Sequence, residues 1–180
     1  MALLAEEIVE EWLNRQGYFT IRGIKIGVQE IDLLAIRFLG DKTDCRHIEV
    51  QASINPVSYV TGVSKAIQKN SGSAPNSAKK RSEEELEDCV QEWIEKKFHK
   101  DSKQKARHML VPHGKWKYEL VVNKIKHSDE IDVIIKHGIN IIFLSEIISN
   151  LEKGEAPIEG ASGSDFVDLV LLKNSIVKGS

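Results

Sequence analysis

Residues 28–53 read VQEIDLLAIRFLGDKTDCRHIEVQAS and give the clearest structural pattern in the chain. Aliphatic and β-branched residues dominate residues 28–38, a composition that is typical of β-strands, and in residues 46–53 Ile48, Val50 and Ala52 alternate with polar residues as in a strand. Between them, Gly-Asp-Lys-Thr-Asp at residues 40–44 has the composition of a tight turn. The pattern therefore predicts two adjacent strands joined as a hairpin.

The residues before this hairpin predict one helix and one more strand. Leu4, Ile8, Trp12 and Leu13 recur at helical spacing, and Gly17 is a natural stop for the helix that they indicate. Residues 18–25 are rich in aromatic and β-branched types and predict a strand. The chain thus opens as helix, strand, strand, strand, with the strands expected in a meander.

The residues after the hairpin predict alternating helices and strands, and the fold class is therefore α/β. Ser82 and Glu85 form a capping-box pattern before an apolar helix, and residues 70–82 are either a flexible loop or an insertion. A strand, a helix and a strand in succession imply a parallel crossover. The expected elements are a helix over 58–69, a helix from 83, a strand over 118–123, a helix over 128–137, a strand over 139–144 and a helix over 145–151.

Length and composition indicate one soluble globular domain over residues 1–152. The chain has 180 residues, of which 41% are hydrophobic and 29% are charged. We expect residues 153–164 to be a linker and residues 165–180 a docking segment or tail, helical over 165–173. No apolar run approaches the roughly 20 residues of a membrane helix, and no basic leader opens the sequence. With only two cysteines, a reducing, cytoplasmic location is expected.

The net charge of -2 conceals a cationic middle segment. Residues 65–126 hold fifteen basic and nine acidic side chains, whereas each flanking segment is acidic. Such a cluster suits a phosphate backbone, although a solvated helix face would look the same. The dense part of the cluster consists of Lys96, Lys97, Lys100, Lys103, Lys105 and Arg107.

Two acidic residues within the hairpin strands are difficult to explain as surface charge. Asp32 has apolar neighbours, and Glu49 lies in the run Ile-Glu-Val-Gln. A carboxylate in a central strand is costly unless it is paired, exposed or bound to a cation. Strands joined by a tight turn can place Asp32 beside Glu49, and a divalent cation would relieve their repulsion. Oxygen ligands favour Mg²⁺ or Mn²⁺, and the histidines show no zinc spacing.

The order of these elements resembles the PD-(D/E)XK nuclease superfamily, whose fold is the restriction-endonuclease-like αβββαβ core. That pattern is a helix with a Glu, a strand with an Asp and a strand with Glu-x-Lys. Here Glu6 fits the helix position best, with Glu10 as its competitor one turn later. Asp32 and Glu49 match the two strand positions, but Gln51 stands where most members have Lys.

The resemblance implies metal-assisted hydrolysis of DNA phosphodiester bonds by a central mixed sheet flanked by helices. Asp32, Glu49 and the Val50 carbonyl would hold Mg²⁺ or Mn²⁺, with Glu6 contacting it directly or through water. Gln51 would position the attacking water, and Lys65 or Lys69 would supply the missing charge. The cationic cluster would bind the DNA backbone. The alternative is an inactive nuclease-fold module that binds nucleic acid or a protein.

Other residues have simpler interpretations. Trp93, Ile94 and Phe98 are expected in the core, and Cys45 and Cys89 are expected as buried small hydrophobes. Asp129 and Glu130 suit a helix N-terminus by their charge and suggest no site. Because 180 residues leave little room for a separate specificity domain, a homodimer or a partner subunit is also considered.

Overall fold

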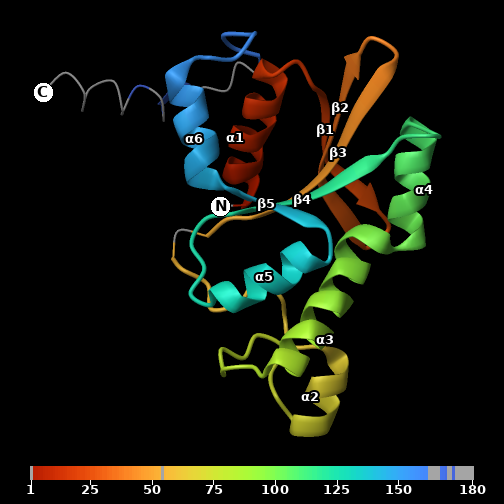
Figure 1. The fold of residues 1–180 in the computed structure, drawn as a ribbon, viewed down its shortest axis with the longest axis vertical. Helices are drawn as coiled ribbons and strands as arrows, with labels where there is room; N and C mark the ends of the chain where they lie inside the picture. The colour runs from red at the N-terminus through yellow and green to blue at the C-terminus, as the bar shows by residue number, and fades with distance from the viewer. Residues whose placement is uncertain (1, 54, 162–166, 170–171, 173–180) are drawn as a thin grey trace, which may run out of the picture.

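A computed structural model describes residues 2–53, 55–161, 167–169 and 172, and its centre is one mixed β-sheet (Figure 1). The sheet has five strands in the order β1-β2-β3-β4-β5. The strands are β1 (Phe19–Ile26), β2 (Gln29–Leu39), β3 (Lys42–Gln51), β4 (Trp116–Val122) and β5 (Ile139–Phe143). The helices are α1 (Ala2–Arg15), α2 (Lys65–Ser71), α3 (Glu83–Ile94), the π-helical turn η1 (Glu95–His99), α4 (Asp101–Leu110), α5 (Ser128–Lys136) and α6 (Leu144–Lys153).

The first three strands form the expected antiparallel meander. β1 pairs with β2, and β2 pairs with β3 through a register that places Leu34 opposite His47. Gly27 and Gly40 both have positive φ angles at the two connections, 61° and 60°, a conformation that glycine adopts without steric cost. The hairpin predicted from residues 28–53 is therefore confirmed.

The remaining strands are parallel to β3, as the strand–helix–strand order predicted. β3 pairs with β4 and β4 pairs with β5, both in parallel, and α5 makes the crossover between β4 and β5. A parallel connection needs a crossover segment, usually a helix, because the chain must return to the end of the sheet at which the first strand began. The predicted mixed sheet flanked by helices is present.

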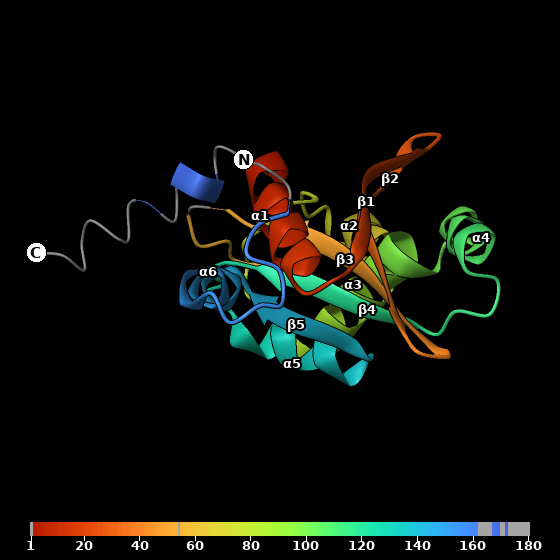
Figure 2. The ribbon, with the colours of Figure 1, turned by 90° about the horizontal axis from the view of Figure 1, so that it is seen from above.

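Helices cover both faces of the sheet and enclose two apolar cores (Figure 2). α1 and α6 pack side by side on one face, where Val9, Leu13 and Ile48 are buried. On the other face, α3, η1 and α5 pack over Leu120 and Val122, and Trp93, Ile94 and Phe98 are buried as predicted. Cys45 and Cys89 are buried free thiols, also as predicted.

The predicted helix over residues 58–69 is wrong in its first part, because α2 begins only at Lys65. Residues 58–64 form an irregular segment held by a buried carboxylate. The Glu130 carboxylate accepts hydrogen bonds from the backbone N–H groups of Val60 and Thr61 and from the Thr61 hydroxyl. Arg81 bonds the Thr61 carbonyl at 2.9 Å and lies 3.6 Å from Glu130. These tertiary bonds take the backbone groups that a helix would have used.

The helical run predicted after Ser82, which carries Phe98, is present. Ser82 and Glu85 form the predicted capping box, and α3 continues through η1, where Phe98 is buried. The chain then turns at Lys100 into α4, an element that the sequence pattern did not define. The helix predicted over residues 165–173 lies largely outside the described residues, within which Val167 packs against the α1 and α6 core. Within the described part of the chain, no helix combines the length and apolarity that crossing a membrane requires.

Replacing Glu130 should test how much stability this buried cluster provides. Glu130→Ala leaves the Arg81 charge and two backbone N–H groups without their partner, so we expect a loss of about 3–5 kcal/mol in the free energy of unfolding. Asp129→Ala is the matched control, since Asp129 is exposed on the same helical turn, and should cost less than about 1 kcal/mol. Urea denaturation measures both values, and equal losses would contradict this role for Glu130.

Candidate functional site

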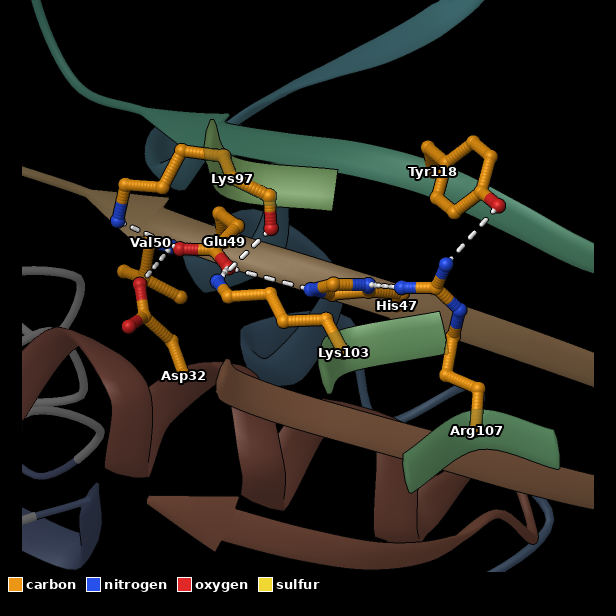
Figure 3. Close-up of polar contacts among 8 residues, drawn as sticks. All are labelled: Asp32, His47, Glu49, Val50, Lys97, Lys103, Arg107 and Tyr118. Atoms are coloured by element: carbon orange, nitrogen blue, oxygen red, sulfur yellow. Dashed lines mark hydrogen bonds and ion pairs between the residues drawn. The ribbon is translucent and has the colours of Figure 1, made fainter. Parts of the chain in front are cut away.

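The β2–β3 register brings Asp32 and Glu49 together on one face of the sheet (Figure 3). Leu33 pairs with Ile48 and Leu34 pairs with His47, so one step further along the same register sets Asp32 opposite Glu49. Strand side chains alternate between faces, and Ile48 and Leu33 point into the core under α1. Asp32 and Glu49 therefore point to the opposite face, toward α3, η1 and α4.

Asp32 is held in a position where its negative charge is unfavourable. Its Oδ2 atom accepts a hydrogen bond from the Val50 backbone N–H at 2.8 Å. Burial and the nearby Glu49 carboxylate raise the pKa of Asp32 to about 7, although Lys97 and the Val50 N–H oppose this rise. A carboxyl group with this pKa is only partly ionised at neutral pH, and a neighbouring cation would favour its charged form.

Glu49 is fully buried and is surrounded by cationic and hydrogen-bonding groups. Its Oε2 atom lies 2.6 Å from the Lys97 Nζ. Its Oε1 atom lies 2.9 Å from the Lys103 Nζ and 3.1 Å from the His47 Nε2. Burial alone would raise the pKa of Glu49, but His47, Lys97 and Lys103 outweigh it and lower this pKa to about 2. Glu49 is therefore a permanent anion at physiological pH.

A series of hydrogen bonds links Glu49 through His47 to Arg107 and Tyr118. Arg107 Nη1 lies 2.7 Å from His47 Nδ1, and Arg107 Nη2 lies 3.3 Å from the Tyr118 hydroxyl. A guanidinium can only donate, so His47 Nδ1 accepts and the proton resides on Nε2, which donates to Glu49. Burial lowers the pKa of His47 to about 4 despite its contact with Glu49. His47 is thus a neutral donor with one fixed tautomer.

Glu6, rather than Glu10, lies within the electrostatic influence of this cluster. Burial raises the pKa of Glu6, as do Glu30 and Glu49, while Arg22 and Lys97 lower it. Glu6 is buried, and its carboxylate makes no hydrogen bond or ion pair to any residue that the structure describes. Glu10 instead accepts from the Thr20 hydroxyl and pairs with Arg22 at 3.1 Å. Glu10 therefore links α1 to β1 through these two contacts.

Gln51 bonds to the segment after β3, and the two lysines of α2 face solvent. The Gln51 Nε2 donates to the Val60 carbonyl at 2.7 Å, which fixes the amide at the end of β3. Lys65 and Lys69 are exposed on α2. The cation on Glu49 is Lys97, together with Lys103, so neither α2 lysine occupies the position that sequence reasoning proposed.

The cationic cluster of residues 96–107 divides into a buried and an exposed part. Lys103 and Arg107 are buried, and Lys97 is about one-third exposed. These three bond to the cluster around Glu49, whereas Lys96, Lys100 and Lys105 remain accessible to solvent. In this conformation the predicted DNA-contacting surface of the cluster is therefore reduced to Lys96, Lys100 and Lys105.

Sequence reasoning did not identify the three groups that contact Glu49, which are His47, Lys97 and Lys103. It assigned Lys97, Lys103 and Arg107 to the DNA backbone, whereas Arg107 bonds His47. The only sequence signal was indirect: an acid inside an apolar strand needs partners, and a dense basic cluster was available to provide them. Nothing in the spacing showed which lysines turn inward.

The donor set fits a hard divalent cation in part. Glu6, Asp32 and Glu49 supply oxygen ligands, the type that Mg²⁺ and Mn²⁺ prefer. Glu6 is buried without a partner within the described part of the chain, and Asp32 uses one carboxylate oxygen there. Across residues 2–53, 55–161, 167–169 and 172, however, no three His, Cys, Asp or Glu side chains already converge in the geometry of a metal site. A bound cation would share Glu49 with Lys97.

Comparison with known proteins adds little to this description. No protein-family model matches the sequence, and no curated protein matches it significantly. A structural search found the crystal structure of a protein of unknown function, AF1548, at a TM-score of 0.43 and 15% sequence identity. The match covers 93% of this chain and 77% of the other. This similarity is too low to carry an argument about either fold family or function.

Asp32 should make the metal-free protein less stable at alkaline pH. Its pKa is about 7 in the folded state and 3.8 as the reference value, so the folded state binds more protons between these values and stability falls as pH rises. Asp32→Asn keeps the acceptor for Val50 and removes the charge. We expect it to unfold at higher urea concentration than wild type at pH 8 in EDTA, with little difference at pH 4.

The exposed residue Asp41, in the β2–β3 turn, provides the matched substitution. Asp41→Asn should leave the urea midpoint nearly unchanged at both pH values. An Asp32→Asn variant that is no more stable than wild type at pH 8 would contradict the electrostatic description of Asp32.

Proposed function

We propose that this protein hydrolyses DNA phosphodiester bonds in a metal-dependent reaction, most simply as an endodeoxyribonuclease. The observation that carries the proposal is the pairing of Asp32 with Glu49 on one sheet face, with the Lys97 ammonium 2.6 Å from Glu49. Two strand carboxylates and a lysine are the functional groups of a Glu-x-Lys nuclease site. In this chain the lysine comes from η1 and not from the position occupied by Gln51.

The proposal assigns a distinct task to each group. Asp32 and Glu49 would hold Mg²⁺ or Mn²⁺ with the Val50 carbonyl, and Glu6 would contact it directly or through water. When bound, such a cation polarises the scissile phosphate and makes a nucleophile from water. Lys97 would stabilise charge that develops on the phosphate in the transition state. The amide of Gln51 would orient the attacking water.

The fold and the exposed charge support the same interpretation. The chain begins with α1 and the meander β1, β2, β3, and after α2, α3, η1 and α4 it adds β4 and β5 in parallel to β3. A helix, a three-stranded meander, helical elements and further parallel strands are also the order of a restriction-endonuclease-like core. Lys96 on η1 and Lys105 on α4 are exposed, and Lys100 between these elements is half-buried. They are placed to contact the DNA backbone, which adds affinity without reading the base sequence.

A specific observation favours the alternative, an inactive nuclease-fold module that binds nucleic acid or a partner. Both oxygens of Glu49 already contact ammonium groups, Oε2 that of Lys97 and Oε1 that of Lys103. The negative charge of Glu49 is therefore compensated without a metal. Under this alternative the buried ion cluster serves stability alone, and cleavage would be absent.

Cleavage of plasmid DNA separates these two functions. The purified protein should nick or linearise supercoiled DNA with Mg²⁺ or Mn²⁺ and be inactive in EDTA. Asp32→Asn should abolish cleavage while DNA binding persists, because it removes a metal ligand and leaves the exposed lysines intact. Asp41→Asn should cleave like wild type. Absence of metal-dependent cleavage by the wild type would contradict the proposed function and favour the binding module.

A lysine exchange tests the role of Lys97. Lys97→Met should lower kcat by about 100- to 1,000-fold, the effect of losing one preorganised charge in a transition state. Lys97→Met combined with Gln51→Lys should recover part of the rate, because the cation returns to the same end of β3. Lys115→Met, at an exposed position before β4, controls for the loss of one positive charge. Unchanged kcat in Lys97→Met would contradict the assignment.

A further inference from the structure

A second feature lies beside the carboxylates, at the end of β3. A pocket of about 430 Å³ opens between the irregular segment after β3 and the side of α3. Gln51 forms part of its lining, and Gln51 shares a strand face with Glu49. The volume is within the usual range for small-molecule sites. The pocket therefore adjoins the proposed reaction centre.

The wall of this pocket is irregular in structure but firmly held. On its inner side, Glu130 and Arg81 bind the backbone of residues 60–61, as described above. Further hydrogen bonds run from Gln51 to the Val60 carbonyl, from the Val63 N–H to the Pro75 carbonyl and from the Lys65 N–H to Glu92. Burying a carboxylate and a guanidinium is costly. Here the bonds of Glu130 and Arg81 offset that cost and hold the segment in one conformation, so the pocket wall is preformed.

The lining of the pocket combines cationic, planar and amide groups. Lys65 and Lys96 are exposed at the pocket, one from α2 and the other from η1, and Trp93 lines it from α3. Glu92 also lines the pocket, where its Oε2 accepts from the Lys65 N–H at 2.8 Å. Two ammonium groups suit a phosphate. The Trp93 indole is largely buried against Phe98, and the small part of it that remains exposed at the pocket offers an apolar contact for a base. The negative charge of Glu92 disfavours an anion in the pocket, but the two positive charges of Lys65 and Lys96 outweigh it.

We infer that this pocket binds one nucleotide unit of a nucleic-acid strand, adjacent to the phosphate that is cleaved. Lys65 and Lys96 contact its phosphate, Trp93 contacts its base, and the Gln51 amide marks the boundary with the carboxylate site. This inference rests on the proposed function, since it names the part of the site that receives the substrate strand. It gives a role to the two lysines that the fold brings together from α2 and η1.

Binding of a short fluorescein-labelled single-stranded oligodeoxynucleotide, followed by anisotropy in EDTA, tests the inference without cleavage. The Lys65→Met/Lys96→Met variant should bind roughly tenfold more weakly, and the slope of log K against log salt should fall by about 0.7 for each lysine removed. Lys136→Met, exposed on α5, should bind like wild type. Equal binding by the double variant and wild type would overturn the inference.

Two further measurements exclude misfolding and a simple anion site. Glu92→Gln retains an acceptor for the Lys65 N–H and removes a like charge, so it should bind the oligonucleotide more tightly than wild type. The oligonucleotide should quench tryptophan fluorescence in wild type and much less in Trp93→Phe. Weaker binding by Glu92→Gln, or quenching by inorganic phosphate equal to that by the oligonucleotide, would overturn the nucleotide assignment.

The two proposals fail in distinguishable ways. A protein that binds the oligonucleotide through this pocket but never cleaves DNA contradicts the proposed function alone. A protein that cleaves DNA, and whose Lys65→Met/Lys96→Met variant binds and cleaves like wild type, contradicts the pocket alone.

Discussion

The buried negative charge of Glu49 is the constraint on which the surrounding structure depends. A carboxylate at 1% exposure is tolerated only when its charge is compensated, and here Lys97, Lys103 and His47 do so at 2.6–3.1 Å. Lys97 lies in η1 and Lys103 in α4, so their ion pairs with Glu49 attach both elements to the sheet. Arg107 completes the arrangement by fixing the tautomer of His47. The same contacts that stabilise the fold thus orient the carboxylate.

Asp32 and Glu49 respond to their shared location in opposite ways. Glu49 has cationic partners and a lowered pKa, whereas Asp32 accepts one backbone hydrogen bond and has a raised pKa of about 7. Two neighbouring carboxyl groups with separated pKa values are a common arrangement at functional sites. The arrangement leaves Asp32 as the group that gains most from an added cation, and Glu6 is a buried carboxylate nearby. These are the electrostatics that the proposed metal site requires.

Local patterns predicted most elements of the fold, and long-range charge pairing explains what they missed. The hairpin of residues 28–53 could be predicted because turn composition and strand periodicity agree within one short segment. The first part of the predicted helix over residues 58–69 failed because Glu130, distant in sequence, takes its backbone N–H groups. Asp32 and Glu49 could be paired from the hairpin alone. Lys97 and Lys103 could not be assigned to Glu49, because exposed and buried lysines look alike within one basic cluster.

Anomalous scattering from crystals grown with Mn²⁺ tests the central claim most directly. The account predicts a peak between the carboxylates of Asp32 and Glu49, with Glu6 nearby, and no peak in crystals of Glu49→Gln. Lys97 should remain close to Glu49 in the metal-bound protein. The absence of a peak in the wild type, with both Lys97 and Lys103 still paired to Glu49, would contradict a metal site here and identify the cluster as a structural ion network.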